Sequence, residues 1–362
     1  MKLAHIPLKA AVGYGRCARA GSIDLAVHCL LRRRPGRACL AMVLLAMSAQ
    51  AVPAAQTMYT DKQLTEDKIR YTQKFEFLYE TGLRNFMTPN EKRALTDVVI
   101  RHPLRGATPL TVKSLEFEGV PTVVAPVKSL KFIEDLSVAY AWRYNHRYSL
   151  EPMDEYVAML KLAAGQDPPG DWSPDPMKAL GVPPKVWERE PQVDDLSLRF
   201  RNTAWAFILA HELGHLAMGH TQAKASPAEI QRQEEAADEF AVDLLGRSQT
   251  VPMGMILWFQ ATAGYMRNRS DFPSDAAYIA WVQNEASHPV NGARMRNLAM
   301  IMQRQAAAER DPGQAEFLNY IAERLVVIGE TIEDPEMQQL LGRCAAARRP
   351  QDLKRLQDLP CP

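Results

Sequence analysis

The chain has 362 residues, of which 47% are hydrophobic and 23% are charged, a composition typical of a globular protein with one large or two small domains. Its net charge of +1 hides an uneven distribution, because residues 1–51 hold eight of the 43 basic residues and one of the 42 acidic residues. The rest of the chain therefore carries a net charge of −6, which argues against a nucleic-acid partner.

A basic segment followed by a short apolar stretch predicts an export signal at the N-terminus. The apolar stretch covers residues 38–47, and ten residues are too few to span a bilayer. Small residues follow at 49–51 and 52–54, as they do at signal cleavage sites. We expect residues 1–51 to be removed and the protein to reach the periplasm or the outside of the cell, with no integral membrane domain left. A buried N-terminal helix or an uncleaved membrane anchor is the alternative.

Residues 56–165 are expected to form a helical segment with a small β-hairpin. Apolar residues at helical spacing predict helix over 61–100, and further helices over about 129–144 and 154–164. Between residues 110 and 127 the apolar residues partly alternate, Gly119 interrupts them, and β-branched residues with prolines follow, which predicts the hairpin. Seven prolines within 166–195 then predict a loop or linker.

Residues 196–362 are predicted to form a helical domain. The expected fold class is therefore mainly α, of the α+β type, with the small hairpin before the helical half. Periodicity, caps and breakers predict helices at about 196–219, 227–246, 253–267, 274–286, 291–309, 313–330 and 335–347.

The first of these helices carries three ionisable groups in a stretch that is otherwise apolar nearly all round. His211, Glu212 and His215 are the ionisable residues of 203–218, so the sequence predicts that they are buried. Burying them costs several kcal/mol unless a divalent metal ion binds both imidazoles. Positions i and i+4 lie about 40° apart on a helix, so both rings reach one ion while Glu212 points toward its open coordination position. A hydrogen-bonded pair of core histidines is the alternative.

The next helix is expected to supply a third metal ligand. A capping box beginning at Ser226 starts this helix, and its apolar residues define a buried face. Glu234 lies at the edge of that face, whereas Glu235 points to solvent, so Glu234 is the predicted ligand. With a turn near residue 223, His215 and Glu234 lie at about the same level of an antiparallel helix pair.

Asp238 lies one turn beyond Glu234 and is placed to accept the second N–H of His211 or His215, which would fix the tautomer of that ring. An ordinary helix acid is the alternative. His220 lies about 140° around the helix from His215 and is not expected to be a ligand. Zinc in catalytic sites takes three protein ligands and a water molecule, so this set predicts one zinc ion per chain.

Three motifs follow one another: HELGH at 211–215, an ExxxD pattern from Glu234 to Asp238, and an HPxxxxR pattern from His288 to Arg294. Together they resemble the gluzincin zinc peptidases, and they look closest to the HtpX/Ste-type endopeptidases. The interval between HELGH and Glu234 is shorter than in that family, and its paired transmembrane helices are missing. The short interval and the sequence after it are closer to the ImmA/IrrE-like peptidases, which are cytosolic.

The resemblance covers about residues 205–296 and implies a zincin-like helical metallopeptidase core. It assigns a function to each motif residue: zinc ligands His211, His215 and Glu234, general base Glu212, supporting carboxylate Asp238, and His288 and Arg294 close to the site. For His288 three functions stay open, namely stabilising the oxyanion, gating the metal, or capping the helix that begins near residue 291.

These observations predict a zinc endopeptidase that cleaves peptide bonds in exported or envelope proteins, with Glu212 taking a proton from a zinc-activated water. The β-branched segment 120–127 is expected to dock an extended substrate by β-augmentation. Two other functions are alternatives. One is an exported zinc-containing binding or chaperone-like module without proteolysis, and the other is a cytosolic regulatory protease of the ImmA/IrrE type.

Two of the five cysteines, Cys344 and Cys361, remain after removal of the signal. In an oxidising compartment such a pair is a candidate disulfide. Two unpaired thiols are the alternative.

Overall fold

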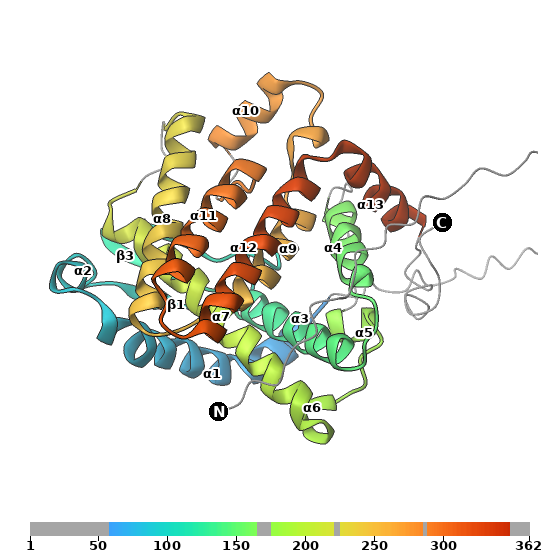
Figure 1. Ribbon diagram of the computed structural model, residues 1–362, viewed down its shortest axis with the longest axis horizontal. Coiled ribbons are helices and arrows are strands. Elements are labelled where there is room, and N and C mark those ends of the chain that lie inside the picture. Colours follow the sequence, from blue (N-terminus) through green and yellow to red (C-terminus); the bar gives the residue numbers. More distant parts are fainter. Residues whose placement is uncertain (1–57, 165–174, 221–224, 285–287, 348–362) are drawn as a thin grey trace, which may run out of the picture. The chain divides into compact units, whose positions relative to one another are not determined.

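The computed structural model describes residues 58–164, 175–220, 225–284 and 288–347 (Figure 1). They belong to one unit, which extends over residues 55–362. Helices dominate it, and three short strands form its sheet, so the predicted mainly-α, α+β class is confirmed. The predicted signal at 1–51 and Cys361 lie outside the described residues. Export and the disulfide from Cys344, which is itself buried, therefore stay predictions.

The segment before the sheet is helical, as predicted, but it is broken into several pieces. Thr60 and Thr88 begin two of these helices with capping boxes, in which each threonine accepts a backbone N–H three residues later. A π-helical turn and a 3₁₀ turn separate these helices. The elements are α1 (Asp61–Phe77), η1 (Leu78–Leu83), η2 (Arg84–Phe86) and α2 (Pro89–Ala94).

The sheet contains the predicted hairpin and one additional strand. β2 (Lys113–Phe117) and β3 (Val120–Val124) pair antiparallel, and Glu118 and Gly119 turn the chain with φ of +53° and +79°. β1 (Val99–Arg101) pairs parallel with β3, which gives the strand order β1-β3-β2. The expectation that segment 120–127 docks a substrate strand is wrong, because β3 is paired on both sides. The outer edges of the sheet belong to β1 and β2.

The proline-rich stretch 166–195 is partly helical where the structure describes it. It contains α5 (Pro176–Ala179) and α6 (Val186–Arg189), and α7 (Pro191–Ala217) begins five residues earlier than predicted. Pro176 and Pro191 each occupy the first turn of a helix, where a missing N–H costs nothing and the fixed φ suits the helix. The stretch predicted as a loop or linker is therefore helical at these two positions.

The other helices lie close to their predicted ranges. In the described ranges, no helix combines the length and the hydropathy that a membrane span needs. The helices are α3 (Val127–Asn145), α4 (Glu151–Ala164), α8 (Pro227–Arg247), α9 (Gly254–Tyr265), α10 (Asp275–Asn284), α11 (Gly292–Ala308), α12 (Pro312–Glu333) and α13 (Pro335–Ala347), with a 3₁₀ turn η3 (Arg269–Asp271) after α9.

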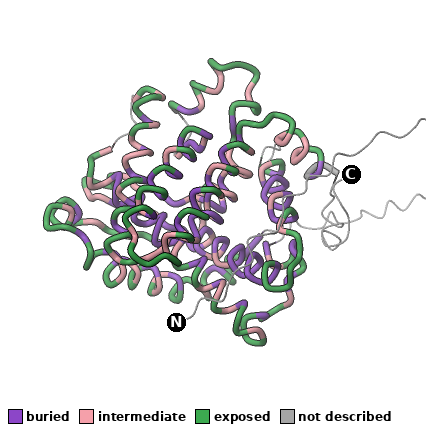
Figure 2. Tube along the Cα trace, viewed as in Figure 1, coloured by how far each residue is buried: buried purple, intermediate pink, exposed green. Residues whose placement is uncertain are grey.

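α7 lies at the centre of the helical packing. It contacts α3, α8 and α9, while α11 packs between α8 and α12 (Figure 1). One hydrophobic core runs from Met58 to Ile332, so the predicted segments 56–165 and 196–362 share it, and Figure 2 shows its buried residues along the inner sides of the helices. At Gly254, a Cβ would lie 2.0 Å from the carbonyl oxygen of Phe200, so α9 approaches α7 as closely as backbones allow.

A half-buried carboxylate links α7 to two other helices. Glu134 of α3 accepts hydrogen bonds from Arg70 Nη2 and Tyr71 on α1, and from Arg201 Nη1 on α7, with the arginine contacts at 2.9 and 2.7 Å. Burial by itself would raise the pKa of Glu134, but Arg70, Tyr71 and Arg201 outweigh it and lower that pKa from 4.5 to about 2. The ionised carboxylate thus stabilises the folded state.

Glu134→Gln should lower the free energy of unfolding by about 3 kcal/mol at pH 7, because it leaves Arg201 buried without its charged partner. The folded-state pKa is depressed, so this contribution is complete above pH 4.5 and is lost as the pH falls toward 2. Urea unfolding of both proteins at several pH values measures it. Glu80→Gln is the control, since Glu80 pairs with Arg84 at an exposed position. A constant difference at all pH values would contradict the prediction.

Candidate metal centre

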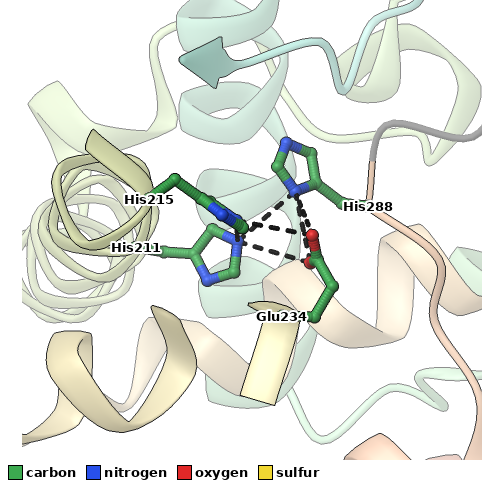
Figure 3. A group of neighbouring side chains, drawn as sticks. All are labelled: His211, His215, Glu234 and His288. Atoms are coloured by element: carbon green, nitrogen blue, oxygen red, sulfur yellow. Dashed lines mark hydrogen bonds and ion pairs between the residues drawn. The ribbon is translucent and has the colours of Figure 1, made fainter. Parts of the chain in front are cut away.

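Four side chains from three segments point toward one another in the interior (Figure 3). His211 and His215 come from α7, Glu234 comes from α8, and His288 precedes α11. One nitrogen or oxygen atom of each lies within 4.8 Å of the others, so the group is able to hold a metal ion. His211 and Glu234 are only 5% and 1% exposed, which leaves these polar atoms little water to bind.

The close packing of α7 and α8 depends on a glycine between the two histidines. At Gly214, a Cβ would lie 3.1 Å from Cδ1 of Phe240, so a larger residue would push α8 away. On α8, the Ser226 side chain accepts the N–H of Glu229 and begins the helix as predicted. Of the two neighbouring glutamates, Glu234 is buried toward α7, and Glu235 is half-buried and accepts a hydrogen bond from Gln231.

The atoms that face one another are imidazole nitrogens and carboxylate oxygens, which are hydrogen-bond acceptors when they carry no proton. His211 Nε2 lies 3.1 Å from His215 Nε2 and 3.5 Å from Glu234 Oε2, and His215 Nε2 lies 3.4 Å from Glu234 Oε1. His288 Nδ1 lies 3.1 Å from Glu234 Oε1 and 3.4 Å from His211 Nε2. Lone pairs at such distances repel one another unless protons or a cation lie between them.

Asp238 and Arg294 hold two of these groups in position. Asp238 Oδ1 lies 2.9 Å from His211 Nδ1, so His211 is the ring that Asp238 contacts. Arg294 donates two hydrogen bonds of 2.8 Å to Asp238, and its Nη1 lies 2.6 Å from Glu234 Oε2. Burial would raise the pKa of both carboxyls, but Arg294 lowers the pKa of Asp238, and His288 and Arg294 lower that of Glu234.

The pKa values of the two rings on α7 are shifted in opposite directions. Burial lowers the pKa of His211, but Asp238 and Glu234 outweigh burial and raise it. Burial also lowers the pKa of His215, and here the neighbouring charges leave it low. His215 is therefore the ring that stays neutral most readily, and a neutral ring is the form that binds a metal.

Glu212 and His288 contact each other beside the four-residue cluster. His288 Nε2 lies 3.2 Å from Glu212 Oε1, while Glu212 Oε2 has no hydrogen-bond partner among the described residues. Burial would raise the pKa of Glu212, but His288 lowers it to about 2. Glu212 and Glu234 in turn outweigh burial at His288 and raise its pKa to about 10. His288 thus bridges the carboxylate beside the cluster and the carboxylate within it.

The sequence excluded His220 as a ligand but did not predict its contact with His215. His220 Nδ1 lies 3.0 Å from Nδ1 of His215, on the side of that ring opposite the cluster. It is not one of the four converging groups, in agreement with its exclusion as a ligand. The signal that could have found it is Gly219, because a glycine after the last helical turn bends the chain back toward the helix.

Three of the four residues of this cluster, His211, His215 and Glu234, lie inside the part of the chain that is similar to a known family. Residues 184–254 match the family model Peptidase U49. The match covers all of α7 and α8, with His211, Glu212, His215 and Glu234, but it ends before His288. It supports a peptidase that acts on peptide substrates, without selecting among the more specific families that the motifs resemble. Comparison with curated proteins and with solved structures gave no significant match.

A divalent cation bound at this cluster should stabilise the protein, because it would lie between acceptors that otherwise repel one another. Free Zn²⁺ at 100 times its dissociation constant should raise the free energy of unfolding by about 2.7 kcal/mol relative to chelator-treated protein. Thermal unfolding with chelator and with added Zn²⁺ measures the effect. In Glu234→Gln the difference between the two conditions should shrink, and an equal difference in both proteins would place the bound metal elsewhere.

Proposed function

We propose that this chain is a zinc-dependent endopeptidase. The observation that carries the proposal is the convergence of His211, His215 and Glu234 beside Glu212, within the segment that matches a peptidase family. Zinc binds imidazole nitrogen and carboxylate oxygen at about 2.0–2.2 Å, so two ligands of a tetrahedral ion lie roughly 3.3 Å apart. The separations here are 3.1, 3.4 and 3.5 Å, which suits zinc without movement of the helices.

The chemistry that zinc supplies in such a site is Lewis acidity, which lowers the pKa of a water molecule to about 7 and polarises a peptide carbonyl. Glu212 follows His211 directly, and its buried Oε2 is available to accept the proton of the attacking water. The same carboxyl then gives that proton to the amine nitrogen as the C–N bond breaks. Asp238 and Arg294 keep His211 and Glu234 oriented throughout.

His288 completes a four-ligand arrangement, and this favours a gating function over the other two that the sequence left open. Its Nδ1 lies 3.1 Å from Glu234 Oε1, and its Nε2 contacts the carboxylate that should serve as general base. Catalytic zinc sites keep one position open for water, whereas structural sites are closed by four protein ligands. We therefore infer that His288 turns away from the cluster before a water molecule and a substrate enter.

The same observation supports a second candidate function. A zinc ion held by His211, His215, Glu234 and His288 together would resemble a structural site. In that case the protein would be a zinc-containing binding or chaperone-like module, and Glu212 would serve only as a partner of His288.

We propose further that the peptidase is exported and acts on envelope or exported proteins, which rests on the basic and apolar pattern of residues 1–51. The HPxxxxR pattern favours an HtpX/Ste-type relationship, while the short interval after HELGH favours the ImmA/IrrE type. N-terminal sequencing of protein purified from cells separates export from a cytosolic regulatory protease, because only an exported protein begins near residue 52.

Glu212→Gln should lower the rate of casein cleavage 10²- to 10⁴-fold, since it removes the general base, while the bound zinc and the melting temperature stay close to those of the wild type. A protease assay with metal analysis tests this. Glu235→Gln is the matched control, because Glu235 neighbours the proposed ligand Glu234 and is half-buried on α8. Unchanged cleavage by the Glu212 variant would leave the binding module as the better account.

His288→Ala should increase casein cleavage at saturating zinc, because it opens the fourth position and releases Glu212 from its contact with the ring. Zinc affinity should fall in the same variant, since one of four ligands is lost. Titration of zinc into wild type and variant, followed by the assay, gives both values. A 10²-fold or greater loss of turnover with zinc bound would instead assign His288 to oxyanion stabilisation.

A further inference from the structure

The two metal-binding rings on α7 are supported by different partners. An imidazole that binds a metal through Nε2 carries its proton on Nδ1, and that N–H needs an acceptor. For His211 the acceptor is the carboxylate of Asp238. For His215 the atom that faces Nδ1 is Nδ1 of His220, at 3.0 Å. The partner of His211 is thus a carboxylate, and the partner of His215 is a second imidazole.

The contact between His215 and His220 determines where the protons lie. Two N–H groups cannot point at each other, so one Nδ1 must donate and the other must accept. If His215 binds the metal through Nε2, it is the donor, and His220 accepts with its own proton on Nε2. The rings meet edge to face, with planes 71° apart and centroids 5.1 Å apart.

The end of α7 places His220 in this position. The helix ends at Ala217, and Gly219 follows with φ +63°. The N–H of Gly219 donates to the carbonyl of Leu216 at 3.2 Å, and the N–H of His220 donates to the carbonyl of His215 at 2.9 Å. This pairing is a Schellman motif, which turns the chain back over the last turn. On a continuing helix His220 would lie about 140° away from His215, and no contact would form.

We propose that His220 is a positioning residue for the metal centre, which sets the tautomer and the orientation of His215. The inference rests on the proposed function, because it requires a metal at His215 Nε2. His220 is half-buried at the end of α7 and touches the ligand rather than the metal. Losing such a support lowers metal affinity 10- to 100-fold in comparable sites.

Zinc dissociation constants of the full chain, measured by competition with a chromophoric chelator, test the proposal. His220→Ala and His220→Leu should each bind zinc 10- to 100-fold more weakly, since neither supplies an acceptor and leucine still fills the space. His220→Asn should stay within a few-fold of the wild type, because its amide oxygen lies near the position of the lost Nδ1. Met218→Ala is the control, since Met218 is an exposed neighbour on the same turn.

The absorption spectrum of the Co²⁺-loaded protein gives an independent readout of ligand orientation. It should change in the Ala and Leu variants and return toward the wild type with Asn. Equal zinc affinity in all His220 variants, in a wild type that binds zinc, would overturn this inference and leave the proposed peptidase intact. A wild type that binds no zinc would instead overturn the proposed function itself.

Discussion

The rest of the site depends on charge balance among side chains that are buried where α7, α8 and α11 meet. Glu212, Glu234 and Asp238 are each only 1% exposed, and Arg294 is the buried cation that contacts two of them. Carboxylates this deeply buried are tolerated only when cations and hydrogen bonds compensate them. Arg294 balances Asp238 and part of Glu234, and protonated His288 or a metal ion balances the remainder. This requirement explains why so many polar groups converge at one point in an apolar interior.

The packing of the neighbouring helices against α7 holds the side chains of the site in place. Glycines at 214 and 254 let α8 and α9 lie directly against α7, and Glu134 ties α7 to α1 and α3 through charged hydrogen bonds. Groups held on packed helices keep their geometry better than groups held on loops. The two rings on α7 are therefore fixed with respect to Glu234, whereas His288 lies outside any helix.

The family match covers one part of the site, and the structure adds a second part. The matched segment ends at residue 254 and holds the two rings, Glu212 and Glu234, which are the central residues of the zinc peptidase site that we propose. Residues 288–294 complete the site from a distant part of the chain and supply the charge that Glu234 and Asp238 need. The residues inside the matched segment and the residues that balance their charge thus come from separate parts of the sequence, which meet because α11 packs against α8.

By itself, the sequence determined whatever follows from local period and spacing. The i, i+4 pair on an apolar helix, the preference for Glu234 over Glu235, and the hairpin at Gly119 all reflect patterns within about ten residues. Only the tertiary structure decided which strand is central, because β1 has three residues and pairs with a strand some twenty residues away. It likewise decided the place of His220, which depends on a left-handed glycine, and the double contact of His288, which depends on helix packing. Long-range contacts such as those of β1 and His288 leave no periodic trace in the chain, so the sequence pattern alone does not predict them.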